Sequence, residues 1–234
     1  MNPPLSNQEL GLLRATNTPT IANAMEGLGV GPRDRGFTRE PVRCMFPDLG
    51  VMVGYAVTAT IRSATPPSAQ PPHFLKAYWD WIAGSPAPRV VVAQDLDQPP
   101  AGAWWGEINA NIHRALGCVG LVTDGTVRDL DEVRPLGFQF VAAGVSVSHV
   151  FAHLDDFGKP VTVGGMTVQP GDIIHADKHG AIVIPAAHAH AVLAAVQEVE
   201  RYERPLIQLC KSRDFSIAEL ERLMKNEGGR QKDH

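Results

Sequence analysis

The sequence contains few cysteines, and no two of them lie close together. Its three cysteines, Cys44, Cys118 and Cys210, are widely separated in a chain of 234 residues. This spacing excludes a CxxC redox motif and a zinc site built from cysteine pairs. It favours buried free thiols in a reducing compartment.

A basic surface and long apolar runs are absent as well. The formal net charge is −4 and the pI is about 6.1, so no basic field attracts nucleic acid or a membrane surface, and neither is an expected partner. No apolar run approaches a membrane span, and the opening MNPPLSNQEL lacks the basic and apolar regions of a signal peptide. We therefore expect a cytoplasmic protein in which local charges hold any anionic substrate.

Aromatic residues are scarce, and no nucleotide-binding loop is present. Aromatic side chains make up 6% of the sequence, which predicts a core of Val, Ile, Leu and Ala. Neither GxGxxG nor GxxxxGK[ST] occurs, so nucleotide cofactors have no support. The length fits a single domain over residues 1–234.

The N-terminal segment, residues 1–30, is predicted to be helical. Residues 6–28 predict a helix that is broken or bent near Pro19. The residues available for its apolar stripe are Leu10, Leu13, Ile21, Met25 and Leu28.

Residues 51–64, VMVGYAVTATIRSA, are rich in β-branched side chains and predict a long strand. Four prolines within residues 65–74 then predict a loop, and a short helix is expected over residues 74–82.

Strands and helices alternate in the middle of the chain. RVVVAQDLD, CVGLVTDG and FQFVAAGV predict three buried strands. The first connection contains a helix that begins near Glu107, and the second, TVRDLDEV, predicts a short helix. This order predicts an α/β fold with a parallel βαβαβ unit, whose functional sites lie at the carboxyl ends of the strands.

The C-terminal third has a different pattern. Residues 159–185 contain short strands separated by GG, PGD and KHG turns, which predicts a block of antiparallel strands beside the parallel unit. The C-terminal segment, residues 187–234, is predicted to be a helix to about Tyr202 followed by a polar tail.

Three charged residues are expected to meet at the carboxyl edge of the parallel unit. Glu107 lies at the start of the first connecting helix, and Arg128 and Asp129 lie at the predicted start of the second. Free amides and the helix dipole at these two ends favour a bound anion. Two carboxylates in such a crevice call for a cation between them, and hard oxygen ligands suit Mg²⁺ or Mn²⁺.

An adjacent arginine and aspartate, taken alone, are more often a solvated surface pair or a helix cap. The residues around Arg128 and Asp129 change that interpretation. GEINANIHRALGCVGLVTDGTVRD, with twenty residues between Glu107 and Arg128, resembles the signature of the RraA-like family. TPTIANAMEG, VGYAVTA and VTVGGMTVQPGDIIHADKHGAIVIP resemble further segments of that family.

The family includes class II pyruvate aldolases that act on 4-hydroxy-4-methyl-2-oxoglutarate and 4-carboxy-4-hydroxy-2-oxoadipate. The resemblance implies that Asp129 binds the divalent metal, that Glu107 supports it directly or through water, and that Arg128 holds the substrate. The segment Gly106, Glu107, Ile108 and Asn109 would supply backbone amides to the substrate. It also implies a swivelling β/β/α fold in trimers or hexamers, with the active site at a subunit interface.

The implied function is a lyase that cleaves a 4-hydroxy-2-oxo diacid by retro-aldol reaction, decarboxylates oxaloacetate, or does both through a pyruvate enolate. The sequence departs from the aldolases at Asn23, where they carry an acidic residue that handles protons, and Asn cannot act as an acid or base. Glu26 lies one turn later and is a candidate replacement. Glu107 favours an enzyme, because the regulators of ribonuclease activity in this family carry Gly there.

Two alternative functions stay open. One is a non-catalytic regulatory or binding protein with the same fold, and the other is a related metal-dependent decarboxylase or hydrolase of an aromatic-degradation intermediate. Trp104 and Trp105 could wall a pocket or pack in the core. The histidine pairs His149/His153 and His175/His179 lie in strand and turn contexts, which disfavours zinc ligation, although His179 or Asp177 could approach the substrate.

Overall fold

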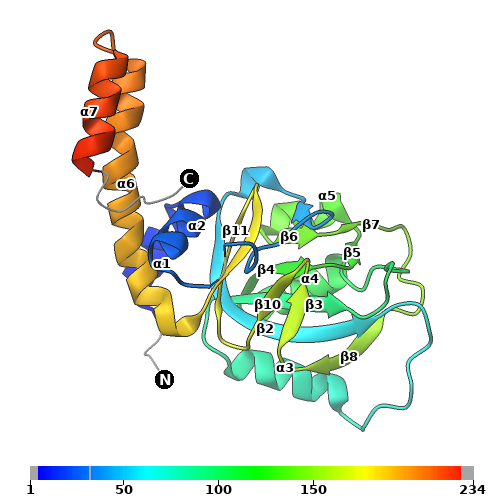
Figure 1. The fold of residues 1–234 in the computed structure, drawn as a ribbon. Coiled ribbons are helices and arrows are strands. Elements are labelled where there is room, and N and C mark those ends of the chain that lie inside the picture. Colours follow the sequence, from blue (N-terminus) through cyan, green and yellow to red (C-terminus); the bar gives the residue numbers. More distant parts are fainter. Residues whose placement is uncertain (1–4, 32, 228–234) are drawn as a thin grey trace.

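The computed structural model describes residues 5–31 and 33–227. It has a mixed α/β fold in which one large sheet carries helices on its outer face (Figure 1). The ends of the predicted segments 1–30 and 187–234, residues 1–4 and 228–234, lie outside the described part. The α-helices are α1 (Asn7–Arg14), α2 (Thr18–Gly27), α3 (Phe74–Gly84), α4 (Glu107–Ala115), α5 (Leu130–Val133), α6 (Ala189–Lys211) and α7 (Ile217–Glu227).

The main sheet has the order β1-β6-β4-β3-β2-β11-β12, and β8 also pairs with β2. Its strands are β1 (Arg43–Cys44), β2 (Met52–Arg62), β3 (Arg89–Asp95), β4 (Cys118–Thr123), β6 (Gln139–Ala142), β8 (His153–Phe157), β11 (Ile173–Asp177) and β12 (Gly180–Ile184). The small sheets contain β5 (Thr126–Val127) with β7 (Gly144–Val145), and β9 (Val161–Val163) with β10 (Met166–Val168).

The pairing confirms the predicted combination of parallel and antiparallel strands. β2, β3, β4 and β6 are parallel neighbours, whereas β9-β10 and β11-β12 are antiparallel hairpins. The chain before β1 bridges β12 at Phe37 and Ile182, and β1 itself pairs with β6. One continuous segment therefore contacts both ends of the strand order, and the sheet is nearly closed.

Strand β2 shows why the sheet is buried on both faces. Alternate residues of a strand point to opposite faces, and Met52 and Ala56 pack inside the curled sheet against the β9-β10 hairpin and β12. Val53 and Tyr55 pack on the outer face under α1, α2 and α6, and further along the same face Val57 packs under α3 and α4. The strand is therefore a nearly continuous apolar run in the sequence.

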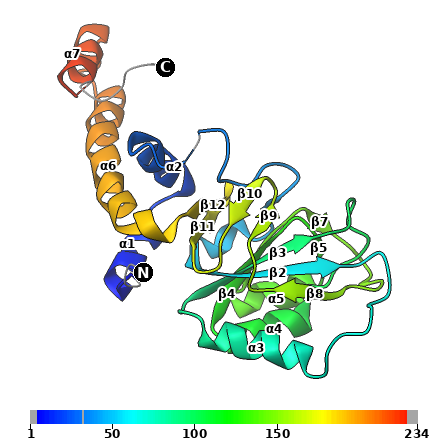
Figure 2. The same ribbon diagram turned by 60° about the horizontal axis from the view of Figure 1, so that its bottom comes forward.

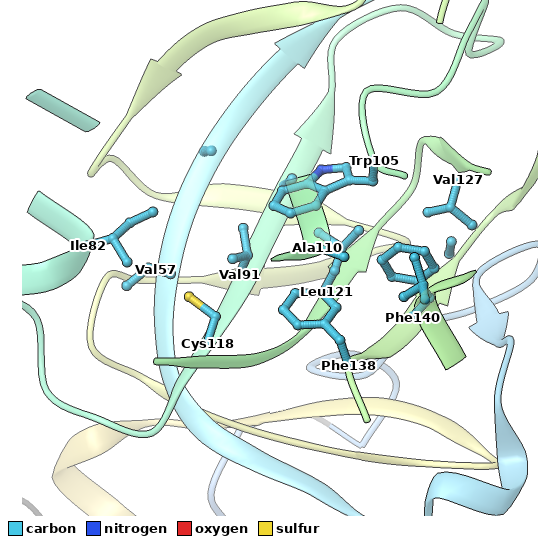
Figure 3. Packing of buried hydrophobic residues seen from close by; sticks show 14 of the residues in the cluster. Val57, Ile82, Val91, Trp105, Ala110, Cys118, Leu121, Val127, Phe138 and Phe140 are labelled. Carbon is cyan, nitrogen blue, oxygen red and sulfur yellow. The ribbon is translucent and has the colours of Figure 1, made fainter. Parts of the chain in front are cut away.

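The helices lie in two groups on the outer face, as Figure 2 shows. α3, α4 and α5 cover the parallel strands, where a cluster of large side chains including Trp105, Leu121 and Phe140 is fully buried (Figure 3). α1, α2 and the first part of α6 cover β11 and β12, and the rest of α6 projects away from the sheet with α7 folded back along it (Figure 1).

The predicted break near Pro19 is present at the N-terminus, and one residue of the predicted stripe needs correction. The break lies at residues 15–17, because Asn17 caps α2 by accepting a hydrogen bond from the Thr20 amide, and Pro19 fits the first turn, where a missing N–H costs little. Leu28 is 42% exposed and does not join the apolar stripe.

Other corrections concern the later elements. The segment TVRDLDEV forms the two-residue strand β5 followed by α5, because Thr126 and Val127 pair with β7. Residues 153–157, which include His153, form β8, which pairs with β2. The last helix continues through Pro205 to Lys211, and the expected tail contains α7. Among the described residues, no helix is long and apolar enough to cross a membrane.

The β11-β12 hairpin is tied to α2 by Asp177, which is 5% exposed. Its Oδ2 accepts a hydrogen bond from the Thr18 amide (2.9 Å), and its Oδ1 accepts from the His179 amide (2.8 Å) and lies 2.9 Å from His179 Nδ1. Burial alone would raise the pKa of Asp177, but these hydrogen bonds outweigh burial and lower the pKa.

We expect Asp177→Asn to reduce the free energy of unfolding at pH 7 by about 1–3 kcal/mol, because an amide cannot replace the carboxylate at both oxygens. A lowered folded-state pKa stabilises the fold above the unfolded pKa, and this stability is lost as the pH falls through the folded-state pKa. Urea unfolding should therefore show a gap between variant and wild type that narrows below about pH 4. The exposed Asp80→Asn is the control, and a gap independent of pH would contradict the prediction.

Candidate active site

The two segments predicted to form the site run side by side at the carboxyl edge of the parallel strands. Trp105 and Val127 form a parallel bridge, and the Arg128 amide donates a hydrogen bond to the Trp105 carbonyl oxygen (2.9 Å). Gly106 and Glu107, at the start of α4, therefore lie beside Arg128 and Asp129, at the start of α5. The structure brings together the residues that the sequence places twenty residues apart.

The Asp129 side chain caps the N-terminal end of α4. Its Oδ2 accepts a hydrogen bond from the Glu107 amide (2.9 Å) and lies 3.6 Å from Arg128 Nε. Gly106, the residue at the N-cap of α4, has no side chain to cap the helix, so the cap comes from a different segment of the chain. The side chains of Arg128 and Asp129 are 34% and 35% exposed, so both remain accessible to a ligand.

The backbone at Asp129 corrects the predicted geometry. Arg128 and Asp129 precede α5, and Asp129 has φ 56° and ψ 46°, a left-handed conformation that is uncommon for a residue with a side chain. A turn, and not the start of a helix, therefore sets the directions of the two side chains. With four residues, α5 does not form the second anion-binding helix end expected from the sequence.

Gly106 is required by the close approach of the two segments. A Cβ atom at this position would lie 2.3 Å from Asp129 Oδ2 and 3.0 Å from Arg128 Cγ. Its backbone is extended, with φ −155°, so the space and not the dihedral angle demands glycine. Any larger residue must displace the carboxylate from the Glu107 amide.

The side chains in the first turn of α4 differ in exposure and direction. Glu107 is exposed, and Ile108 is 73% exposed. Asn109 turns inward and donates through Nδ2 to the Trp104 carbonyl oxygen. Amides in the first turn of a helix have no intrahelical acceptor, so those of Ile108 and Asn109 remain available to an anion.

The buried side of α4 packs against aromatic side chains through His113. Trp105 is fully buried in the core, and Trp104 is half-buried against Tyr78 and His113. His113 Nδ1 donates to the Asn109 carbonyl oxygen, and Nε2 lies 3.0 Å from the Tyr78 hydroxyl. Burial lowers the pKa of His113 to about 4, so this imidazole is neutral. Trp105 therefore packs in the core instead of lining a pocket.

The predicted proton-handling residues lie elsewhere in the chain. Asn23 donates a hydrogen bond to Glu203 Oε1 on α6 (3.1 Å), and Glu26 lies 3.7 Å from Arg33. Both belong to α2, in the other group of helices (Figure 2). Their expected role is to handle protons at the site of a neighbouring subunit. The structure contains a single chain, so this role stays a prediction.

The histidines of the two predicted pairs have structural partners. His175 is buried between Thr18 Oγ1 and the backbone of α1, and His149 and His153 each contact a backbone carbonyl through Nδ1. Within residues 5–31 and 33–227, no group of three or more His, Cys, Asp or Glu side chains could together hold a metal ion.

Sequence reasoning missed a partly buried acidic network beside the site. Asp95 ends β3 and is 1% exposed, Asp97 is half-buried in the loop that follows β3, and Asp124 is half-buried directly after β4. Burial raises the pKa of Asp124, and it raises that of Asp95 to about 6. The available signal was the position of acids directly after buried strands, in QDLD and TDG.

Comparison with known proteins identifies what the chain resembles. The model of the RraA-like family, described as Aldolase/RraA, matches residues 18–183. A Halalkalibacterium halodurans protein provisionally named a 4-hydroxy-4-methyl-2-oxoglutarate aldolase is 29% identical over 120 residues. That match covers 51% of this chain and 55% of the relative, so the chain spans about half the length of that curated relative.

Two solved structures share the fold. An uncharacterised protein from Pseudomonas syringae pv. tomato superposes with a TM-score of 0.76 at 24% identity, covering 97% of each chain. RraAS2 from Streptomyces coelicolor, described as an unusual member of the RNase ES inhibitor RraA protein family, superposes with a TM-score of 0.68 at 24% identity, covering 86% of this chain and 96% of its own.

We expect Gly106→Ala to displace Asp129 and to lower the free energy of unfolding by about 1–3 kcal/mol, because the Glu107 amide loses a charged acceptor. Urea unfolding measures the free energy, and hydrogen exchange of the Glu107 amide reports the lost bond. Gly11→Ala is the matched control, because a Cβ meets nothing within 4 Å there and alanine favours the interior of α1. Unchanged stability and exchange in Gly106→Ala would refute the close approach.

Proposed function

The chain belongs to the RraA-like family, and we propose that it is a divalent-metal-dependent carbon–carbon lyase. Its reaction is the retro-aldol cleavage of a 4-hydroxy-2-oxo diacid, the decarboxylation of oxaloacetate, or both, since each releases pyruvate through its enolate. The observation that carries the proposal is the Asp129 carboxylate held on the Glu107 amide beside a partly exposed arginine.

The residues present suit Mg²⁺ or Mn²⁺. Asp129 and Glu107 would hold the ion, and ions of this class are commonly bound through one or two carboxylates while keeping several waters. Two carboxylates without a larger ligand cluster among the described residues fit that mode better than a closed all-protein cage. When bound, the ion would stabilise negative charge that develops on the keto oxygen.

Arg128 would bind the substrate carboxylate. A guanidinium can donate two parallel hydrogen bonds to a carboxylate. The fixed Asp129 carboxylate lies beside Arg128 Nε, so it restricts where the guanidinium can point.

The first turn of α4 would supply neutral donors. Gly106 leaves room for the Asp129 carboxylate against the backbone, and the amides of Ile108 and Asn109 can donate to a carboxylate or keto oxygen. Donors that are fixed before the substrate arrives stabilise developing charge without reorganisation. Glu107 has its amide occupied by Asp129, so its contribution is its carboxylate.

Proton transfer in the aldol reaction needs a further group beside Glu107, Arg128 and Asp129. Cleavage of the C3–C4 bond removes the proton of the 4-hydroxyl group, and the enolate takes up a proton at C3. Asn23 cannot exchange a proton, and Glu26 is the nearby acid on α2. We propose that the protein acts as a homotrimer or homohexamer in the cytoplasm, with α2 of one subunit near the site of another.

A second candidate is a non-catalytic protein that binds a partner through the same fold. The observation in its favour is the projecting pair of helices α6 and α7, which exposes Ile207, Ile217 and Met224. RraAS2, one of the structures with this fold, is described as belonging to an inhibitor family. The lyase proposal explains Glu107, Arg128 and Asp129 together, whereas the binding proposal leaves them without a role.

Pyruvate release tests the lyase proposal. We expect activity on oxaloacetate or a branched 4-hydroxy-2-oxo diacid in the presence of Mg²⁺, loss of activity with chelator, and at least a ~100-fold lower kcat/KM in Asp129→Ala. Arg128→Lys should mainly raise KM, because a lysine cannot bind a carboxylate bidentately. Activity that survives both chelator and Asp129→Ala would exclude the metal mechanism. Inactivity on every 2-oxo acid, with tight capture of a protein partner, would favour the binding protein.

The departure at Asn23 gives a separate prediction. Asn23→Glu should raise aldol turnover if a missing proton carrier limits the reaction, and it should leave oxaloacetate decarboxylation less affected. Asn23→Gln is the control, because it adds length without an ionisable group. Equal or lower aldol turnover in Asn23→Glu would contradict this explanation of the departure.

A further inference from the structure

Asp95 lies at the junction of the segments that carry the candidate site. It is the last residue of β3, and its side chain is 1% exposed. Its Oδ1 accepts a hydrogen bond from the Asp97 amide (3.0 Å), and its own amide donates to Asp124 Oδ1 (2.8 Å). One residue thus contacts both the loop that follows β3 and the turn that follows β4.

Asp97 extends the network to the end of β2. Its Oδ2 accepts hydrogen bonds from the amides of Ser63 (2.6 Å) and Ala64 (2.9 Å), and its Oδ1 lies 3.6 Å from Arg62. The Ser63 hydroxyl in turn accepts from the Ala101 amide (3.1 Å). The loop over residues 96–106 is therefore held at its start and at its middle.

Both held segments lead directly to candidate site residues. The loop over residues 96–106 ends at the glycine that precedes Glu107, and Asp124 lies four residues before Arg128 and five before Asp129. A shift of either segment would change the distance between the Glu107 amide and the Asp129 carboxylate, which is 2.9 Å. Hydrogen bonds at Asp95 oppose such a shift.

We propose that Asp95 is a positioning residue of the candidate site: its buried carboxyl group holds the loop, its backbone amide holds the turn, and together they set the spacing between Glu107 and Asp129. The consequence for ligand binding rests on the proposed function. The structural consequence, a fixed Glu107–Asp129 contact, does not depend on it.

The second carboxyl oxygen of Asp95 makes the network sensitive to pH. Among the described residues, Oδ2 is buried without a hydrogen-bond partner, and it lies against Gly125, where a Cβ atom would be 3.0 Å away. Burial, followed by the neighbouring charges of Asp97 and Asp124, raises the pKa of Asp95 to about 6, and Arg62 opposes this rise. His153 also faces the network, through Asp97.

The raised pKa of Asp95 determines how the network responds to pH. A carboxyl group whose folded-state pKa is raised contributes stability that is present at low pH and lost as the pH rises through the folded-state pKa. Below about pH 6 the Asp95 carboxyl group is neutral, so no charge on it is repelled by Asp97 and Asp124. Above it, an unpaired charge is buried beside two other carboxylates, so we expect the loop and the turn to separate more readily.

Binding of oxalate with Mn²⁺, measured by calorimetry between pH 5 and 8, tests the proposal. Asp95→Asn keeps an acceptor for the Asp97 amide and removes the charge. The ratio of the wild-type to the Asp95→Asn dissociation constant should rise about three- to tenfold across pH 6, because other ionisations cancel in the ratio. Asp172→Asn is the matched control, since burial also raises the pKa of Asp172, between β10 and β11, and this variant should follow the wild type.

A constant ratio, or the same ratio in Asp172→Asn, would overturn the proposal. If the wild type binds no Mn²⁺ and oxalate at all, the proposed function fails while Asp95 remains testable through hydrogen exchange of the Glu107 amide. Its protection factor should fall above pH 6 in the wild type and not in Asp95→Asn, and equal protection would overturn the proposal. Should Asp95→Asn not fold, Asp97→Asn removes one of the charges that raise the pKa, and the inflection should move to lower pH.

Discussion

The hydrogen bond from the Glu107 amide to the Asp129 carboxylate is the contact on which the candidate site depends. It joins two connections of the parallel sheet, and neither α4 nor α5 has a cap from its own N-cap side chain at this edge. The bond closes the start of α4, requires glycine at position 106, and fixes a carboxylate beside Arg128. A ligand site built on such a contact is organised before the ligand arrives, and preorganised charge often contributes more to catalysis than any other single effect.

The nearly closed sheet explains why this contact forms where it does. Its inner face is filled by apolar side chains of the sheet and of the β9-β10 hairpin. The contact lies instead at the carboxyl ends of the parallel strands, where sites in such sheets are found. Two buried aspartates, Asp177 and Asp95, differ in their surroundings and therefore in the direction of their pKa shift. Asp177 receives hydrogen bonds from Thr18 and His179, which lower its pKa, whereas Asp95 is buried with one oxygen unpaired among the described residues and has a raised pKa. Asp177 therefore stabilises the fold at neutral pH, whereas we expect the contacts of Asp95 to weaken as the pH rises.

The sequence predicts most of the fold and the identity of the site segments, but not the geometry that joins them. Apolar runs and turn signals locate the long strands β2, β3 and β4 and the start of α4, because burial on both faces leaves a strong pattern. They misplace the helix at TVRDL, since the pairing of β5 with β7 is a contact between distant segments. The left-handed backbone of Asp129 and the unpaired oxygen of Asp95 likewise depend on tertiary contacts. Neighbouring residues in the sequence do not specify them. α7 was missed because a short helix depends on tertiary packing, here against α6, which the local sequence does not reveal.

A crystal structure of the protein grown with Mn²⁺ and oxalate tests the central claim most directly. We expect an anomalous peak within coordination distance of the Asp129 carboxylate, on the side of Glu107, with oxalate also contacting Arg128. The Glu107 amide should still donate to Asp129 in that complex. An ordered site without manganese, or manganese bound only to residues away from Asp129 and Glu107, would contradict the claim.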